Sequence, residues 1–105
     1  MVAMFSSGDV SAVQAVVHPD YFDHQGLGGE PVHGPSGFAR VVAAARSSYA
    51  RLEVTFQDVI ADGDRAAARL QWHGTRLDGD VVRRETIEII RTEQGRAVEH
   101  WGARC

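Results

Sequence analysis

The sequence contains no lysine and no asparagine, and its single cysteine is the last residue, Cys105. Lysine Schiff-base catalysis is therefore excluded, because a guanidinium group cannot replace the lysine amine. One cysteine cannot form an internal disulfide, and a thiol at a chain end is a poor candidate for a nucleophile. The codons for lysine and asparagine are rich in A and T. Their absence indicates a GC-rich genome and favours a bacterial source.

Long apolar runs and blocks of like charge are also missing. No segment approaches the roughly 20 apolar residues of a membrane helix, and the N-terminus lacks the regions of a signal peptide. The 11 basic and 14 acidic residues are dispersed, which removes the attraction on which most nucleic-acid binding depends. We expect a cytoplasmic protein without a membrane or nucleic-acid partner. The 105 residues, 44% of them apolar, fit one domain spanning residues 1–105.

Two stretches in the first half of the chain have helical spacing. The first begins with Ser7 or Asp9 as an N-cap and ends before Pro19, and the second begins near Pro35. The apolar faces are Val10, Val13, Val16 and Val17 in the first helix, and Phe38, Val41, Val42, Ala45 and Tyr49 in the second. The Gly- and Pro-rich stretch between them predicts a loop around one short strand or hairpin.

From Leu52 onward the apolar period becomes two, which is typical of strands. Turn signals at "ADGD", "LDGD" and "EQG" divide this half into four strands, the last three at about residues 65–75, 81–92 and 96–101. Helices followed by an antiparallel meander predict an α+β fold. To bury its inner face the sheet must curve around the helices, and an incompletely filled curve leaves a cavity.

Polar residues alternate with apolar ones along the second and third of these strands. One face of the third strand carries Arg84, Thr86, Glu88 and Ile90, and the second strand sends Arg69, Gln71 and His73 to one side and Ala68, Leu70 and Trp72 to the other. Polar groups in long central strands face water or line a polar pocket, because burial without partners is costly. The pattern leaves open whether His73 faces the pocket or the surface.

The five histidines have no metal-binding spacing such as H-x-x-x-H or H-E-x-x-H. The segment "GLGGEP" lacks the preceding strand and the complete pattern of a nucleotide-binding loop. We therefore expect neither a metal ion nor a cofactor.

Four segments, "HPDYFDHQG", "HGPSGFARVVAAARSSY", "VIADGDRAAARLQWHGT" and "RRETIEIIRTEQGRAVEHW", resemble the SnoaL-like polyketide cyclase family of the nuclear-transport-factor-2-like superfamily. The resemblance implies a cone-shaped α+β fold with a curved antiparallel or mixed sheet, a deep pocket and a homodimer formed through the sheet. It also implies ring closure by intramolecular aldol addition, with acid–base catalysis and no cofactor. The N-terminus matches only the end of the family's first helix, which is therefore shortened here.

The resemblance assigns proton transfer to a carboxylate two positions beyond the histidine of the last strand, assisted by a histidine on the preceding strand. In this chain these positions hold Gly102 and Glu88. Glu88 and His100 share the parity needed to face one cavity if their strands pair, either as an acid–base pair or as a structural one. Glu99 alternates with His100, so at most one of the two faces the pocket.

The remaining candidates concern ligand binding. The resemblance places Tyr21, Asp23 and His24 at the pocket entrance, where a tyrosine can donate to a carbonyl and a histidine can act as a base. Arg84 or Tyr21 is expected to stabilise an enolate, and Trp72 and Trp101 to form walls. The expected ligand is a small, mostly apolar carbonyl compound.

Three functions remain open. The first is a cofactor-independent cyclase or isomerase in which His100 or Glu88 removes a proton next to a carbonyl. The second is a non-catalytic binding module or accessory dimer partner that lacks the acid, as Gly102 suggests. The third is epoxide hydrolysis, which needs two carboxylates flanking an arginine and for which Arg84 and Glu88 are the only visible candidates.

Overall fold

The computed structural model describes residues 1–105 as three helices and six strands. In chain order these are α1 (Val2–Ser7), α2 (Val13–Val16), β1 (Val17–Leu27), β2 (Glu30–His33), α3 (Gly34–Ser47), β3 (Tyr49–Asp62), β4 (Arg65–Arg76), β5 (Val81–Glu93) and β6 (Arg96–Arg104). None of the helices is both long and apolar enough to span a bilayer.

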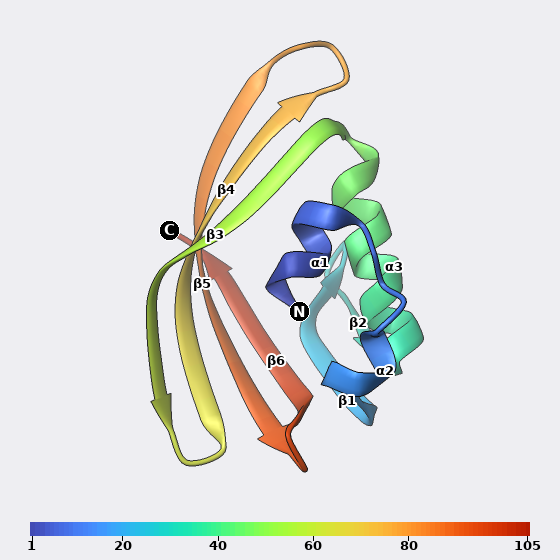
Figure 1. Cartoon of the computed structure of the whole chain (residues 1–105), viewed down its shortest axis with the longest axis vertical. Helices are drawn as coiled ribbons and strands as arrows, with labels where there is room; N and C mark the ends of the chain where they lie inside the picture. Colours follow the sequence, from blue (N-terminus) through green and yellow to red (C-terminus); the bar gives the residue numbers. More distant parts are fainter.

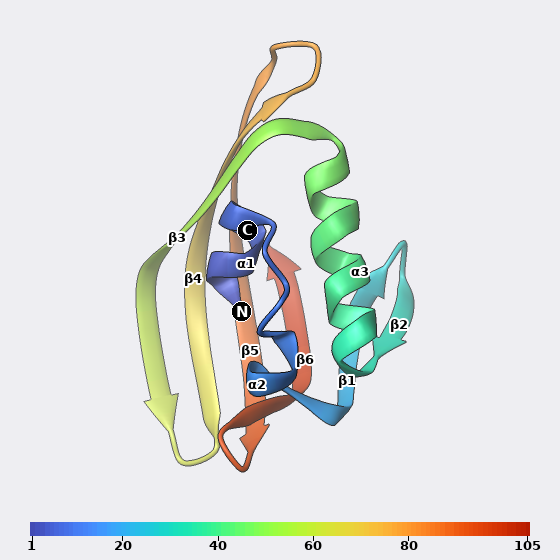
Figure 2. The same cartoon turned by 45° about the vertical axis from the view of Figure 1, so that its right-hand side comes forward.

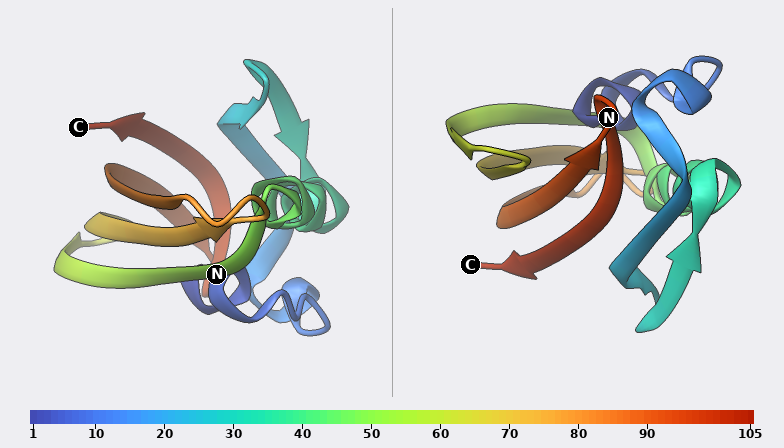
Figure 3. Two further views of the ribbon diagram at one scale, coloured as in Figure 1. Left: turned by 90° about the horizontal axis from the view of Figure 1, so that it is seen from above. Right: turned by 90° about the horizontal axis from the view of Figure 1, so that it is seen from below.

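The six strands form one mixed sheet in the order β2-β1-β6-β5-β4-β3. All neighbouring pairs are antiparallel except β1 and β6, which run parallel. The long strands β3 to β6 curve, and α1 and α3 lie on the concave side of the sheet (Figures 1 and 3). The prediction of an α+β fold with a curved mixed sheet around N-terminal helices is confirmed.

The first predicted helix is wrong in its bounds, because the chain forms two short helices there and then a strand. Gly8 has a φ of 76° and closes α1 in the left-handed conformation, so Ser7 lies at the end of a helix instead of its start. Strand β1 begins at Val17, which is fully buried and pairs with Ala97 of β6. Pro19 lies inside this strand, where the pairing with β6 is irregular, so its missing N–H interrupts no regular ladder.

The core joins α1 and α3 to the sheet. Its larger cluster consists of Met4, Val17, Tyr21, Phe38, Val42 and Ala97, and a smaller cluster contains Leu52, Val54 and Leu70. Phe5 of α1 contacts both sides edge-to-face, with ring centroids 5.7 Å from Phe38 and 5.1 Å from Trp72. Helix α1 therefore packs between α3 and the sheet (Figure 2).

Arg46, in the last turn of α3, binds the C-terminal end of α1. Its Nη1 donates to the backbone carbonyls of Phe5 and Ser6, both at 2.7 Å. These carbonyls belong to the C-terminal end of α1, where a positive charge is favourable. The two helices are thus joined by a charge-assisted contact, and α1 closes one side of the space beneath the sheet.

Replacing Phe38 by alanine is predicted to lower the free energy of unfolding by roughly 3–5 kcal/mol, because its ring joins the helices to β1. The matched control is Phe56→Ala, which removes a side chain from a residue that is 56% exposed, compared with 3% for Phe38. Urea denaturation monitored by tryptophan fluorescence measures both changes. Equal losses in the two variants would contradict the placement of Phe38 in the core.

Candidate functional site

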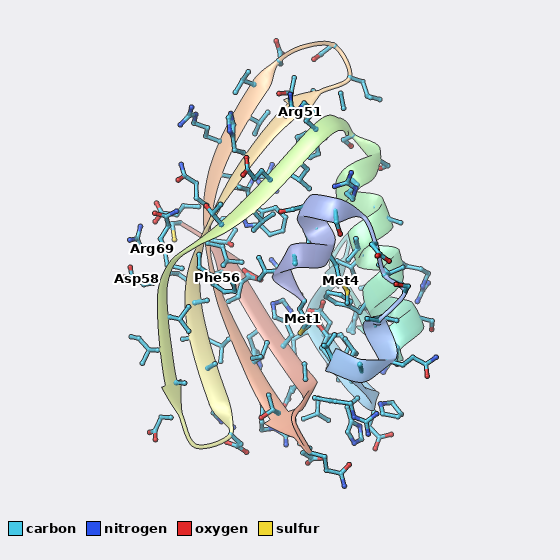
Figure 4. All side chains as sticks on the ribbon, in the orientation of Figure 1. Met1, Met4, Arg51, Phe56, Asp58 and Arg69 are labelled. Carbon is cyan, nitrogen blue, oxygen red and sulfur yellow. The ribbon has the colours of Figure 1, made fainter.

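A cavity of about 500 Å³ lies between the concave face of the sheet and the helices. Most of its wall is apolar, and its polar side chains are Tyr21, Asp23, Gln25, Tyr49, Arg84, Thr86, Glu88, His100 and Arg104. This volume falls in the range of small-molecule pockets. In Figure 4, Phe56 lies on the concave side of the sheet, toward Met1. Asp58 and Arg69 lie on the convex side and point outward from the molecule.

The alternation expected for the central strands matches the cavity wall. β5 contributes Arg84, Thr86 and Glu88 together with two apolar residues, and β4 contributes Trp72 among its inward-facing residues. The intervening residues of both strands face the convex surface because successive side chains of a strand point to opposite sides. Arg84, Glu88 and Trp72 therefore lie where the sequence pattern places them.

His100 lies between two carboxylates at the centre of the wall. Its Nδ1 is 2.7 Å from Oδ1 of Asp23, and its Nε2 is 2.7 Å from Oε1 of Glu88. Asp23 is on β1, directly opposite His100 in the register, and Glu88 is on β5, the other neighbour of β6. The sequence left open whether Glu88 and His100 meet, and the structure brings them into contact together with Asp23.

The two carboxylates favour the protonated form of His100. Burial alone would lower the pKa of His100, but its hydrogen bonds to Asp23 and Glu88 outweigh burial and raise the pKa from 6.5 to about 9. Burial likewise opposes ionisation of Asp23, yet its pKa is lowered because His100 and two backbone N–H groups donate to the carboxylate. At neutral pH His100 is therefore an imidazolium that donates from both ring nitrogens, and it has no lone pair with which to act as a base.

Two polar atoms of the site lack a hydrogen bond of regular geometry within the protein. These atoms are Oε2 of Glu88 and the hydroxyl of Tyr21, and both are buried. Burial, followed by the negative charge of Asp23 and a hydrogen bond to its carboxylate, raises the pKa of Tyr21, so its hydroxyl keeps its proton. Both Tyr21 and Glu88 line the cavity, and Oε2 of Glu88 is an acceptor that no group of the protein satisfies. A ligand that donates to this oxygen removes the cost of leaving it unpaired.

Residues 1–100 match the family model of the SnoaL-like domain. The chain belongs to the SnoaL-like domain family. Its cavity and the His100 cluster are therefore features of a SnoaL-like protein, and the resemblance seen in the sequence is confirmed. No curated protein sequence matches the chain significantly.

Solved structures share the fold of this SnoaL-like protein. A candidate polyketide cyclase from Bacillus cereus is 23% identical, with a TM-score of 0.87 over 98% of this chain and 68% of that one. IdmH, a candidate polyketide cyclase from Streptomyces antibioticus, is 24% identical, with a TM-score of 0.82 over 98% and 85%. A Catenulispora acidiphila protein with a ketosteroid isomerase-like fold, solved with trimethylamine, is 14% identical, with a TM-score of 0.83 over 97% and 79%.

Gly102, which occupies the expected acid position of the SnoaL-like family, lies directly opposite Glu88 in the register. A Cβ atom at this glycine would lie 2.7 Å from Oε1 of Glu88 and 2.5 Å from Oε1 of Gln25. Both distances are too short for a carbon atom, so one or both side chains would have to move. The carboxylate of Glu88 occupies the space next to His100 that a side chain at position 102 would need.

Three of the candidate ligand-binding residues lie outside the cavity, which corrects the expectation for His24 and Trp101 and decides the open question for His73. His24 alternates with Asp23 and stacks on Trp101, with centroids 5.0 Å apart and planes at 8°. Trp101 alternates with His100 and so lies on the convex side, and His73 lies there in a shallow polar depression formed by Glu53, Thr55, Gln71, His73 and Arg83. Each of the three alternates along its strand with residues that face the cavity, so its own side chain points to the opposite side of the sheet.

Glu99 also lies outside the cavity, as its alternation with His100 requires. Its Oε2 is 2.7 Å from Nε2 of His24, and its Oε1 accepts from Nε of Arg91 at 3.0 Å. These hydrogen bonds, the one to His24 first, lower the pKa of Glu99. β6 thus takes part in two histidine–carboxylate contacts on its cavity side and in one on its other side.

The sequence reasoning missed roles for Asp23, Gln25 and Arg104. Tyr21, Asp23 and Gln25 all line the cavity and repeat with a period of two, which is the signal that could have found Asp23. The segment was expected to form a loop, so no parity was assigned to it. Arg104 was missed because β6 continues three residues past Trp101, where the strand was expected to end.

Raising the pH from about 6 to about 10 is predicted to destabilise the protein through His100. The pKa of His100 is about 9 when folded and about 6.5 when unfolded. Its stabilising contribution is therefore fully present below pH 6.5 and is lost as the pH rises through 9. The loss is on the order of 3 kcal/mol, measurable by urea denaturation at a series of pH values.

An NMR titration of the histidine ring protons tests whether His100 causes this loss of stability. The variant His73→Gln, which removes a histidine from the convex face, is the control. One ring is expected to titrate near pH 9 in both proteins. If His100 instead titrates near 6.5, the buried ion cluster is wrong.

Proposed function

We propose that this SnoaL-like protein is a cofactor-independent cyclase or isomerase that acts on a small, mostly apolar, polyketide-like carbonyl compound by acid–base catalysis. The observation that carries the proposal is the buried, unpartnered Oε2 of Glu88 in an apolar cavity, next to a carboxylate oxygen that His100 already occupies. The candidate polyketide cyclases of the same fold supply the substrate class, as part of the proposal.

Glu88 is the proposed general base. Its Oε2 takes the proton from a carbon next to the substrate carbonyl, and the electron pair of the broken C–H bond forms an enolate. The hydroxyl of Tyr21, which stays protonated, donates to the enolate oxygen. His100 keeps its proton throughout and orients Glu88 through the hydrogen bond to Oε1, so it is a positioning residue.

The proton held by Glu88 then has two destinations. In an isomerase it returns to another carbon of the substrate. In a cyclase the enolate carbon forms a bond to a second carbonyl carbon, the first carbonyl is restored, and the proton of Glu88 neutralises the new alkoxide. Either way the atoms of substrate and product are the same. An apolar wall that holds both ends of a flexible chain supplies the positioning on which ring closure depends.

The two alternatives fit the site differently. Asp23 supplies the second inner carboxylate that epoxide hydrolysis requires, but the group between the two carboxylates is His100 and not an arginine. A non-catalytic binding module is consistent with Gly102, and a ligand that donates to Oε2 of Glu88 would satisfy that atom without any reaction. Proton exchange separates the catalytic proposal from the binding module.

We also propose that the protein forms a homodimer through the convex face of the sheet. The register aligns Ile60, Ala67, Ile89 and Trp101 in one row across four strands. Ile60 is 71% exposed and Ile89 38% exposed, which is unusual for large apolar side chains. Next to this row, Arg69 pairs with Asp58 and Glu85, so the face carries both charges and suits a twofold contact with a second copy.

The catalytic proposal predicts that the protein accelerates exchange of the acidic protons of 2-tetralone with D2O, measured by NMR. Glu88→Gln removes the base and is expected to lower the rate by about a hundredfold or more, and Tyr21→Phe by about tenfold or more. Glu53→Gln, on the convex face, is the control and keeps the full rate. Exchange no faster than in buffer, or an undiminished rate in Glu88→Gln, would favour the binding module.

The dimer proposal predicts that Ile89→Glu converts the protein to a monomer, because two charges would be buried opposite each other in the interface. Val81→Glu adds the same charge to the same strand near its other end, and it should leave the dimer intact. Sedimentation equilibrium measures the mass of each. A wild-type protein that is monomeric at concentrations of about 100 μM would rule out this interface.

A further inference from the structure

Two arginines of the cavity wall have no acidic partner. Arg84 is half-buried and Arg104 is exposed, and both line the cavity. The carboxylates that pair with arginine elsewhere in the chain belong to the convex face or the turns, where they contact Arg69 and Arg91. The acid–base cluster does not neutralise Arg84 or Arg104 either, because both Asp23 and Glu88 contact His100.

The sheet register places these two arginines next to each other. Arg104 lies directly opposite Thr86, and Arg84 is the next residue of β5 on the same face. Such diagonal neighbours have Cβ atoms roughly 7–8 Å apart or less, so long side chains can converge on one group. β6 ends at Arg104, and the pair therefore lies where the wall formed by this strand stops.

The charges of the cavity favour an anion at this position. With His100 protonated, the side chains of the wall carry three cations and two carboxylates, and the excess positive side-chain charge is on the arginine pair. Two neighbouring cations without a counter-ion repel each other, and a bound carboxylate removes this repulsion. Guanidinium groups also match the geometry of a carboxylate with paired N–H donors.

The pair is well separated from the proposed base. Arg84 and Glu88 are four residues apart on β5, which is about 13 Å along a strand. Between them the wall is formed by Thr86 and by the apolar side chains of Leu70 and Phe56, which share its row across the sheet. A molecule that reaches both ends therefore has a charged end, an apolar middle and a reactive end.

We propose that Arg84 and Arg104 form an anion-binding subsite that selects carbonyl compounds carrying a carboxylate at the end remote from the reacting carbon. The anion-binding part of the inference stands on the arginines alone, and the identity of the reacting end rests on the proposed function. Arg84, the more buried of the two, makes the larger contribution, since its charge is less screened by solvent.

Binding of a matched pair of probes tests the subsite without any need for turnover. The probes are 6-(2-naphthyl)-6-oxohexanoate and its methyl ester, which differ only in the charge of the remote end. Titration calorimetry is expected to show the acid binding to the wild type about tenfold or more tightly than the ester. The preference should decrease as NaCl is added, because only the acid depends on charge.

Arg84→Gln and the double variant Arg84→Gln/Arg104→Gln are expected to remove the preference for the acid and leave ester binding unchanged. Arg83→Gln, the neighbouring arginine on the convex face, is the matched control and keeps the preference. Circular dichroism establishes that each variant is folded.

Equal affinities of acid and ester for the wild type, failure of the acid to bind at about 1 mM, or a preference that survives in the double variant would each overturn the subsite. The 2-tetralone exchange assay reports separately on Glu88. Exchange with equal probe affinities rejects the subsite alone, and arginine-dependent binding of the acid without exchange rejects the catalytic proposal alone.

Discussion

The ion cluster of His100 is the contact on which the rest of the site depends, because it joins three neighbouring strands at once. Asp23 of β1 and Glu88 of β5 approach the ring of a β6 residue from opposite sides, each at 2.7 Å. β1 and β6 form the only parallel pair of the sheet, with an irregular register before Phe22. Removing His100 leaves two buried carboxylates without their shared partner, which is costly, whereas removing either carboxylate leaves His100 paired with the other. The cluster therefore specifies how the hairpin of β1 and β2 is joined to the main sheet.

The same cluster determines which oxygen is available for chemistry. His100 engages Oε1 of Glu88 and leaves Oε2 buried without a hydrogen-bond partner, in a residue that lines a mostly apolar cavity. On the other side of β6, Glu99 and His24 make a similar contact, but there His24 is 40% exposed and water competes for both groups. The pair of His100 and Glu88 is therefore shielded from water by the cavity wall, whereas the pair of His24 and Glu99 on the opposite face of β6 is partly solvated.

Most of the sheet could be predicted from the sequence, because β4, β5 and β6 are long, regular and bounded by clear turn signals. Their period of two grouped Arg84 with Glu88 and Trp72 with the apolar residues of its own strand, and it gave Glu88 and His100 the parity to share one cavity. The N-terminal third could not be predicted in the same way. Gly8 divides the apolar pattern of that region into two helices, and Pro19 lies inside a strand because an irregular pairing accommodates it. Asp23 received no role because its segment was expected to be a loop, and the alternation that assigns side chains to the two faces of a strand does not apply to a loop.

The close approach of Gly102 to Glu88 also limits how this protein could change over generations. A side chain at position 102 would displace the carboxylate of Glu88 from its place beside His100, together with the amide oxygen of Gln25. Substitutions at the two positions are therefore not additive, and the effect of each depends on the residue at the other.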